Sequence, residues 1–319
     1  DYVGPFDAQN LKEGQTKHYL GTDNLGRDVM AGMIHGTRVA MQVGVISMSI
    51  AFLIGIIIGT MAGYFGDQRL ATFRGRLWLV LLFLLPAFYY AFGVRSYLLA
   101  DALSESLGGF FVQVIISLII FIAIMVLAGL VSKVFRFVPF LKEEVVIPVD
   151  LLISRFIEIF QSIPTFLLIL SIVAIIKTPS LMIVMAIIGF TGWTGIARYV
   201  RGELLKVRSL EFIEASQALG FSEVRIMFKH ALPNALTSVL ITVAFGIAGA
   251  ILTESGLSFL GIGVPPEDVT WGSLLSGARS HFAAWWLAIF PGLAIFVTST
   301  LFNLLGQGLT DAMDPRLKQ

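Results

Sequence analysis

The sequence contains no cysteine and few charged residues. Cysteine is absent from all 319 residues, and Asp, Glu, Lys and Arg together make up 13% of them. The lack of cysteine excludes disulfides, thiolate metal ligands and cysteine nucleophiles. Soluble globular domains carry about 25% charged residues, whereas here hydrophobic residues reach 56%. This composition indicates a membrane protein.

The sequence also has few histidines and a net charge close to zero. The four histidines are scattered without the spacing of metal ligands, so we expect no metal site. The formal net charge of +1 gives no electrostatic basis for binding nucleic acid. No Walker A sequence occurs, and GIG at 261–263 is too short to indicate a nucleotide site. We therefore expect no cofactor and no enzymatic reaction on this chain.

Long apolar segments predict about seven membrane spans, because a span needs ~20 mostly apolar residues. They lie at about 39–64, 77–94, 110–131, 151–176, 181–200, 235–262 and 285–309. The expected fold class is an all-α, polytopic membrane helical bundle. Residues 39–319 would form the membrane domain, preceded by an external polar segment at 1–38.

The positive charges predict the orientation, because Lys and Arg favour cytoplasmic loops. The loops at 65–76, 132–155 and 198–233, with the C-terminal tail, hold 15 of these residues, and the other loops hold 7. We expect the first set and the C-terminus to be cytoplasmic. An external N-terminal segment before an odd number of spans favours one further span upstream of Asp1.

A charged segment, EASQALGFSEVRIMFKHALPNAL (214–236), lies between two predicted spans. The sequence predicts a short helix at 209–219 with one apolar face. That face would consist of Phe212, Ala215, Ser216 and Leu219. Gly220 follows, the residue best suited to a left-handed stop after a helix.

A second short helix is expected after Gly220. Ser222 is a good N-cap, and Phe221 and Ile226 are placed as a hydrophobic staple across it. Pro233 is expected to close or kink this helix near Leu232. The two helices would form an elbow between two spans. The residues alone leave two interpretations open: an interfacial hairpin that covers the end of the bundle, and a docking element for the groove of a soluble partner.

The elbow resembles the EAA loop of permease subunits of binding-protein-dependent ABC importers. The matching pattern is Glu214-Ala215-Ser216, then Gly220, then His230-x-Leu232-Pro233, with Ser216 where the motif usually has a second alanine. In that family the loop's short helix inserts into a cleft on the ATPase subunit and transmits its movement. The resemblance implies that these seven residues couple the chain to an ATPase.

Three further segments narrow the resemblance to the oligopeptide/dipeptide/nickel branch of that family. They lie at 18–44, 252–266 and 290–317, the last containing DAMDPRL. Together they resemble the C-type permease of a peptide-type importer in the bacterial cytoplasmic membrane, a family in which a first span precedes the GTDNLGRD segment. The resemblance implies a heterodimer with a second permease subunit, two ABC ATPases that bind ATP and Mg²⁺, and an external binding protein.

The sequence leaves alternatives open for the transported substrate and for the class of transporter. The branch includes di- and oligopeptide importers, which we expect, and nickel importers, which are the alternative along with importers of other small solutes. An ATP-independent channel or secondary transporter is an alternative of a different class. Such proteins often carry internal repeats or midplane charges, and neither is evident here.

Residues 77–147 depart from the family pattern. The family passes directly from the GYFG loop (63–66) to the span containing SIPTFLL, but here two additional spans intervene. An even insertion preserves the downstream topology. We expect these spans to pack against lipid or a partner span, or the loop at 95–109 to contact the binding protein.

Two residues within predicted spans are candidates for the pathway. An ionisable residue inside a span suggests a functional site, and Glu254 lies about 20 residues into the sixth span. It is either a gate or pathway residue or an interfacial residue at a helix end. Pro164 is expected to kink the fourth span, which would help that span to line the path.

Two charged groups lie near the ends of spans. Asp23, Arg27 and Asp28 form either a folded loop that contacts the external binding protein or a capped interfacial helix with Asp23 as its N-cap. Arg155 and Glu158 are spaced to form a structural ion pair at the inner interface.

Overall fold

The computed structural model describes residues 2–7, 17–105, 107–176, 180–265 and 267–313. Within these ranges the chain is mainly helical, and its contacts divide it into two compact units. Unit 1 consists of residues 1–66 and 150–319, and unit 2 consists of residues 67–149. Four of the charges counted for orientation lie outside the described residues, namely Lys12, Lys177, Arg316 and Lys318.

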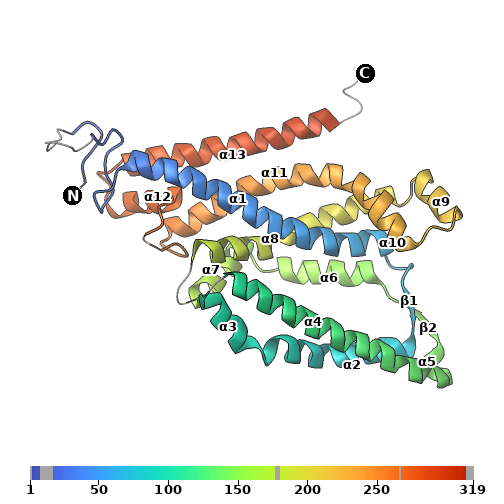
Figure 1. Ribbon diagram of the computed structural model, residues 1–319. Coiled ribbons are helices and arrows are strands. Elements are labelled where there is room, and N and C mark those ends of the chain that lie inside the picture. Colours follow the sequence, from blue (N-terminus) through green and yellow to red (C-terminus); the bar gives the residue numbers. More distant parts are fainter. Residues whose placement is uncertain (1, 8–16, 106, 177–179, 266, 314–319) are drawn as a thin grey trace. The chain divides into compact units, whose positions relative to one another are not determined.

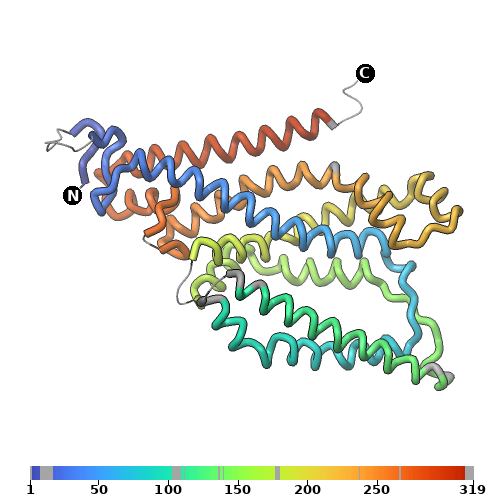
Figure 2. The backbone as a smooth tube through the Cα atoms, in the orientation of Figure 1, coloured from blue at the N-terminus to red at the C-terminus, as the bar shows by residue number. Residues whose placement is uncertain are grey.

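Unit 1 contains the long helices α1, α8, α11 and α13 and several shorter ones (Figure 1). Its helices are α1 (Val29–Thr60), α6 (Val149–Gln161), α7 (Thr165–Ile175), α8 (Leu181–Val207), α9 (Glu211–Ala218), α10 (Glu223–Ile226), α11 (Leu232–Phe259), α12 (Trp271–Ser280) and α13 (Trp286–Met313), with the π-helical turns η1 (Met61–Phe65) and η4 (Met227–Ala231). In the backbone trace, α1 lies beside α8 and α11, and α13 lies beside α11 (Figure 2).

Unit 2 is a helical hairpin closed by two short strands. Its elements are β1 (Ala71–Phe73), α2 (Arg74–Phe88), the π-helical turn η2 (Tyr89–Gly93), α3 (Ser96–Glu105), α4 (Leu107–Val131), the 3₁₀ helix η3 (Ser132–Phe137), α5 (Pro139–Lys142) and β2 (Glu144–Val146). The strands pair antiparallel, with Ala71 opposite Val146. This pairing brings the entry and exit of the unit together.

The helices confirm the predicted polytopic bundle. Six of the described helical segments are long and apolar enough to cross a membrane, and the bent pair α6–α7 makes a seventh if it is one span. Helix α1 begins at Val29, ten residues before the predicted span, because the Asp28 side chain accepts a hydrogen bond from the Met30 amide (2.9 Å) and caps it there.

The predicted break at Pro164 is confirmed. Helices α6 and α7 are bent by 72° across residues 162–164, and Pro164 is the N-cap residue of α7. The Ser162 amide bonds back to the carbonyls of Glu158 and Ile159, which closes α6. The residue before a proline avoids helical geometry, so the chain leaves α6 and restarts in a new direction.

The predicted closure at Pro233 is wrong. The π-helical turn η4 continues directly into α11, and Pro233 lies in the first turn of that helix. Pro233 has no amide to donate to the preceding turn, and the turn before it is the π-helical η4, an irregular turn in an otherwise continuous helix. The Asn234 side chain donates to the His230 carbonyl (2.7 Å) and satisfies an acceptor in this irregular turn. The second short helix therefore continues into a span.

Helices α1 and α8 approach closely along a row of glycines. A Cβ atom at Gly59 would lie 2.5 Å from the Ala197 carbonyl oxygen, and one at Gly63 would lie 2.7 Å from the Arg201 carbonyl oxygen. Gly55 continues this four-residue spacing. Small residues at this spacing let helix backbones pack closely in membranes.

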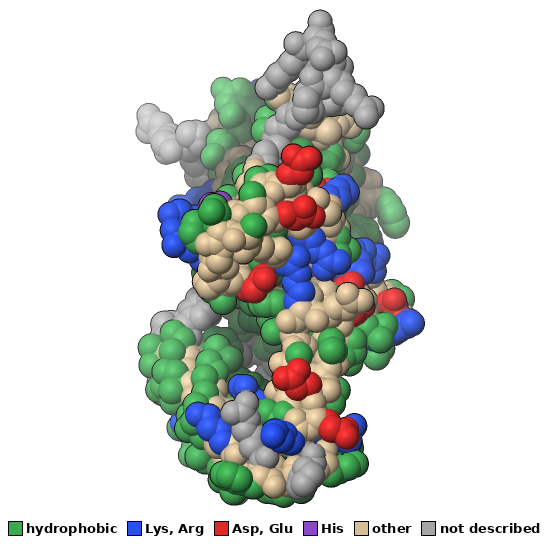
Figure 3. Space-filling view, turned by 90° about the vertical axis from the view of Figure 1, so that its right-hand side faces the viewer, with side chains coloured by type: hydrophobic (Ala, Val, Ile, Leu, Met, Phe, Trp, Pro, Cys, Tyr) green, Lys and Arg blue, Asp and Glu red, His purple; other side chains and the backbone are tan. Residues whose placement is uncertain are grey.

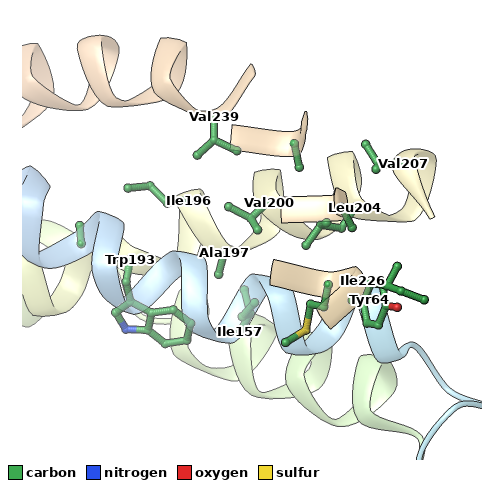
Figure 4. Close-up of a cluster of buried hydrophobic side chains, with 14 of the residues drawn as sticks. Tyr64, Ile157, Trp193, Ile196, Ala197, Val200, Leu204, Val207, Ile226 and Val239 are labelled. Carbon is green, nitrogen blue, oxygen red and sulfur yellow. The ribbon is translucent and has the colours of Figure 1, made fainter. Parts of the chain in front are cut away.

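The largest buried hydrophobic cluster follows the same contact (Figure 4). On α8 it contains Trp193, Ile196, Ala197, Val200, Leu204 and Val207. Tyr64 joins it from the end of α1, and Ile226 and Val239 join it from the segments on either side of η4. The core therefore connects the middle of α8 with the chain beyond its C-terminal end.

Polar contacts fix both ends of unit 2. Arg74 forms an ion pair with Glu143 (2.7 Å) beside the strands. Towards the other end, Arg95 donates to the Gln113 side-chain oxygen (2.5 Å) and to the Ser117 hydroxyl (3.2 Å). An arginine in an apolar hairpin needs such partners, because an unsatisfied polar group in hydrocarbon costs several kcal/mol.

Candidate functional site

The elbow, residues 209–233, has the predicted local geometry. Helices α9 and α10 are joined through Gly220, whose φ is +77°. No other atom lies within 4 Å of the place where a Cβ would be, so glycine is needed here for its backbone conformation. The Ser222 hydroxyl accepts from the Arg225 amide (3.4 Å), which confirms the predicted N-cap.

The apolar face predicted for α9 is largely exposed within unit 1. Ile213 and Ser216 are the buried residues of this helix, whereas Phe212 and Leu219 have exposed fractions of 40% and 73%. Ile213 belongs to the buried cluster that includes Tyr64 and Leu204, so this side chain packs α9 onto the rest of unit 1. The exposed surface of α9 combines apolar side chains, such as Phe212, with the carboxylates of Glu211 and Glu214.

Two polar contacts fasten the elbow to the neighbouring spans. The Tyr64 hydroxyl donates to the Glu223 carboxylate (2.5 Å), and Tyr64 itself is fully buried. The Arg208 guanidinium donates to the Gly63 carbonyl (3.3 Å). These contacts join Arg208, just before the elbow, and Glu223, at the start of α10, to the π-helical turn η1 that follows α1, so the elbow is held by more than its own chain connections.

Aromatic stacking supports the second half of the elbow. The rings of Phe221 and His230 are stacked with their centroids 6.2 Å apart. The Arg225 guanidinium lies 4.4 Å from the centroid of the Phe221 ring, a cation–π geometry. Phe221 also packs against the cluster that contains Ile226, as a staple would.

The motif residues divide into an exposed and a supporting group. The exposed ones are Glu214, Ala215, Gly220 and Pro233. Ser216 and Leu232 are buried, and His230 is half-buried. The Ser216 hydroxyl donates to the Phe212 carbonyl of its own helix (2.7 Å), so serine in place of alanine leaves no buried donor unsatisfied. Figure 3 faces this end of the molecule, where Lys, Arg, Asp and Glu side chains gather around the elbow.

A groove of about 390 Å³ opens on unit 1 between α1, α7, α8 and α11. It is lined by Met48, Thr165, Ile169, Ile188, Thr191, Gly192, Gly195, Ile196, Thr242, Phe245, Gly246, Gly249, Ala250 and Thr253. The break at Pro164 brings Thr165 to its wall. No charged side chain is among these described lining residues.

The wall of the groove is smooth and weakly polar. No atom lies within 4 Å of the Cβ positions of Gly195 and Gly249, so these glycines face open space. The hydroxyls of Thr191 and Thr253 donate to carbonyls of their own helices (2.8 Å each). Such a surface offers backbone and methyl groups, with few groups that would bind a solute tightly.

Sequence reasoning missed this groove. The sequence does contain a pattern that coincides with the groove, because Gly and Thr recur three or four residues apart in the spans containing 191–195 and 242–253. The same spacing also occurs where glycines are covered by another helix, as at Gly59. The pattern alone cannot separate a helix contact from an open wall.

Glu254 is a buried carboxyl group in α11. Its exposed fraction is 2%. The Ser258 hydroxyl donates to it (2.6 Å), and the Ser255 hydroxyl lies 3.4 Å away. Helix α12 packs closely on this part of α11, since a Cβ atom at Gly272 would lie 2.5 Å from the Ser255 carbonyl oxygen. Glu254 is therefore buried close to the contact between α11 and α12 and is not among the residues that line the groove.

The segment at 21–28 is a folded loop. The Asp23 carboxylate accepts from the amides of Leu25 (2.9 Å) and Arg27 (2.8 Å) and forms an ion pair with the Arg27 side chain (2.7 Å). Asp23 is therefore not a helix N-cap, as one interpretation predicted, because its acceptors are used within the loop. Asp28 has that role for α1.

Polar contacts also join α6 to α8. Arg155 and Glu158 form the expected exposed ion pair (2.7 Å) within α6. Gln161 donates to Thr194 (3.0 Å), and Arg201 donates to Asp150 (2.7 Å). Within the described ranges, no three His, Asp or Glu side chains come close enough together to hold a metal ion.

The chain is similar to known transport proteins. A family profile described as binding-protein-dependent transport system inner membrane component matches residues 146–319. The chain is 29% identical over 325 residues to a glutathione transport system permease protein of Pectobacterium atrosepticum, with 99% of this chain and 81% of the relative covered. It is 28% identical over 330 residues to a dipeptide transport system permease protein of Bacillus subtilis, with 99% and 78% covered. An oligopeptide transport system permease protein of Bacillus subtilis is 27% identical over 303 residues, with 95% and 73% covered.

Proposed function

This chain belongs to the family of binding-protein-dependent transport system inner membrane components, and we propose that it forms half of the translocation pathway of an ATP-driven peptide importer. A second permease subunit supplies the other half. An external binding protein delivers di- or oligopeptides, a substrate class suggested by the named relatives. Two ABC ATPase subunits bind ATP and Mg²⁺, and this chain carries neither.

The elbow is the observation that carries this proposal. It presents exposed apolar side chains, including Leu219, next to the exposed carboxylate of Glu214 and to Gly220 in its left-handed conformation. Exposed apolar surface on a short helix suits insertion into a groove of a soluble protein. An interfacial hairpin would bury that surface in the membrane instead, but the gathering of charged side chains at this end opposes burial in hydrocarbon.

The same contacts provide a route for movement. When the ATPases close on ATP, the docked α9 is displaced. The Tyr64–Glu223 bond and the shared core with Leu204 pass that displacement to α1 and α8. Both helices contribute to the groove. The groove therefore changes its opening when the elbow moves, and its weakly polar wall lets peptides of different sequence pass.

The charge distribution supports the orientation. The elbow lies in the loop at 198–233, which holds six of the Lys and Arg residues, so this loop is cytoplasmic by the positive-inside rule, and the same rule favours a cytoplasmic C-terminus in the bacterial inner membrane. The loop around Asp23 and Arg27 is external and is available to the binding protein. The loop at 95–109 is a second candidate for that contact, but residue 106 lies outside the described residues.

The test compares two glycine substitutions in the complex extracted from its native membrane. Gly220→Val and Gly261→Val both place a β-branched residue at a positive φ, +77° and +76°, with open space around each Cβ. Each should cost roughly 1–2 kcal/mol of backbone strain. We expect Gly220→Val to reduce the recovery of ATPase subunits about tenfold and to abolish peptide uptake, while Gly261→Val retains both.

Uptake by reconstituted vesicles separates the alternatives. Labelled di- and oligopeptides and nickel are offered with the binding protein, with and without ATP. ATP-dependent uptake of nickel alone would replace peptides as the substrate. Solute movement without ATP, or equal ATPase recovery from the two valine variants, would contradict the coupling role of the elbow.

A further inference from the structure

A cavity of about 600 Å³ opens on unit 2 along the faces of α2 and α4. It is lined by Phe73, Arg76, Val80, Phe121, Ile122, Met125, Val126, Gly129, Leu130 and Lys133. All of these residues belong to unit 2. The lining is apolar along most of its length and carries its two charges, both positive, at one end.

The two cations, Arg76 and Lys133, stand at the mouth of the apolar part. The Arg76 guanidinium lies over Gly129, with Nη2 3.7 Å from the place where a Cβ of that residue would be. Lys133 follows one helical turn after Gly129. Among the described residues neither cation has a carboxylate partner, whereas the neighbouring Arg74 is paired with Glu143. Both side chains are exposed.

The apolar part has the length of one membrane leaflet. Phe121, Ile122, Met125, Val126 and Leu130 lie on one face of α4. Leu130 lies nine positions after Phe121, which is ~14 Å along a helix. The hydrocarbon core of a bilayer is ~30 Å thick, so one leaflet contributes ~15 Å. The cations therefore stand at headgroup depth when α4 spans the membrane.

We propose that this cavity binds an anionic phospholipid. Its phosphate lies between Arg76 and Lys133, and one acyl chain lies along α4 from Leu130 towards Phe121. Basic pockets between membrane helices bind anionic headgroups in this way. With the orientation proposed above, the site faces the cytoplasmic leaflet. The proposal does not otherwise depend on what the chain transports, because it requires only that unit 2 lies in a bilayer.

Gly129 gives the site its width. No atom other than those of Arg76 lies within 4 Å of a Cβ at this position. A larger side chain would therefore begin in the space beside the guanidinium, where only Arg76 lies close to the Cβ position. Gly129→Leu therefore narrows the site while it keeps both charges.

The test is a lipid titration of the purified full chain in detergent, followed by native mass spectrometry. Phosphatidylglycerol is compared with phosphatidylcholine of the same acyl chains. The variant R76Q/K133Q is compared with R69Q/K142Q, which removes two exposed cations of unit 2 from outside the cavity. We expect R76Q/K133Q to bind phosphatidylglycerol roughly thirtyfold more weakly, about fivefold for each charge, and R69Q/K142Q to bind it normally.

Two further measurements decide the chemistry of the ligand. Gly129→Leu should weaken phosphatidylglycerol binding without a change in net charge, since it blocks the space beside Arg76. Inorganic phosphate at millimolar concentration should not displace the lipid if the acyl chain contributes. Equal binding of the two lipids, unchanged binding to R76Q/K133Q, or full displacement by inorganic phosphate would each overturn the proposal.

Discussion

At the residue scale, the buried carboxyl group of Glu254 allows a stability prediction. Glu254→Leu would leave the hydroxyl of Ser258 without its acceptor in a site with 2% exposure. Removing one partner of a buried hydrogen bond costs about 1–3 kcal/mol. We expect Glu254→Leu to lower the apparent melting temperature in detergent by several degrees, and Glu254→Gln, which keeps an acceptor, to lower it much less.

Transport by the glutamine variant distinguishes the two interpretations of this residue. A structural carboxyl group predicts near-normal uptake by Glu254→Gln in reconstituted vesicles. If that variant melts like the parent protein but no longer transports, Glu254 acts in the pathway or gate instead. Glu158→Gln, which changes an exposed carboxylate in an ion pair, serves as the control for loss of charge.

Residues whose role depends on the local backbone could be predicted from the sequence. Gly220, Ser222 and Pro164 have the expected geometry because a positive φ, an N-cap and a pre-proline break are properties of a few adjacent residues. The cap of α1 could not be assigned in the same way. Asp23 and Asp28 are both suitable caps, and only the fold of the loop shows that Asp23 uses its acceptors internally.

At the element scale, the glycine row on α1 allows a packing prediction. A side chain at Gly59 would meet the Ala197 backbone at 2.5 Å, and backbone atoms cannot move aside as the end of a side chain can. We expect Gly59→Leu to separate α1 from α8 and to prevent a monodisperse peak in size-exclusion chromatography. Overpacking costs typically 1–3 kcal/mol and more where backbones touch.

Gly202→Leu is the matched control for this prediction. Gly202 lies in α8, and no atom lies within 4 Å of its Cβ position, so a leucine there has room. The protein should remain monodisperse with a melting temperature within a few degrees of the parent. Monodisperse behaviour of Gly59→Leu would mean that α1 and α8 do not depend on this close approach.

The sequence predicts which segments form helices better than it predicts which side chains those helices pack together. Hydrophobic runs of span length are set by the bilayer thickness, so the helices of the bundle follow from composition alone. The packing of one helix against another does not follow from composition. Ile213 is buried in a cluster supplied largely by α1 and α8, and because these partners are distant in the sequence, the pattern around residue 213 does not predict this contact.

At the scale of the whole molecule, the division into two units predicts that residues 67–149 can be removed. The Asp150 amide donates to the Gly66 carbonyl (3.3 Å), so the two chain ends left by the excision already lie side by side within unit 1. The salt bridge of Asp150 with Arg201 also remains. Removal of two spans keeps the orientation of the later ones.

We therefore expect a chain in which one or two glycines replace residues 67–149 to insert, to associate with its ATPases and to transport peptides within severalfold of the parent rate. Size-exclusion chromatography, ATPase recovery and ATP-dependent uptake measure these three properties. The same chain should lose the phosphatidylglycerol bound at Arg76 and Lys133, because both residues are gone. A shortened chain that fails to fold, although the chain ends at Gly66 and Asp150 are rejoined, would show that unit 1 depends on unit 2 for its stability.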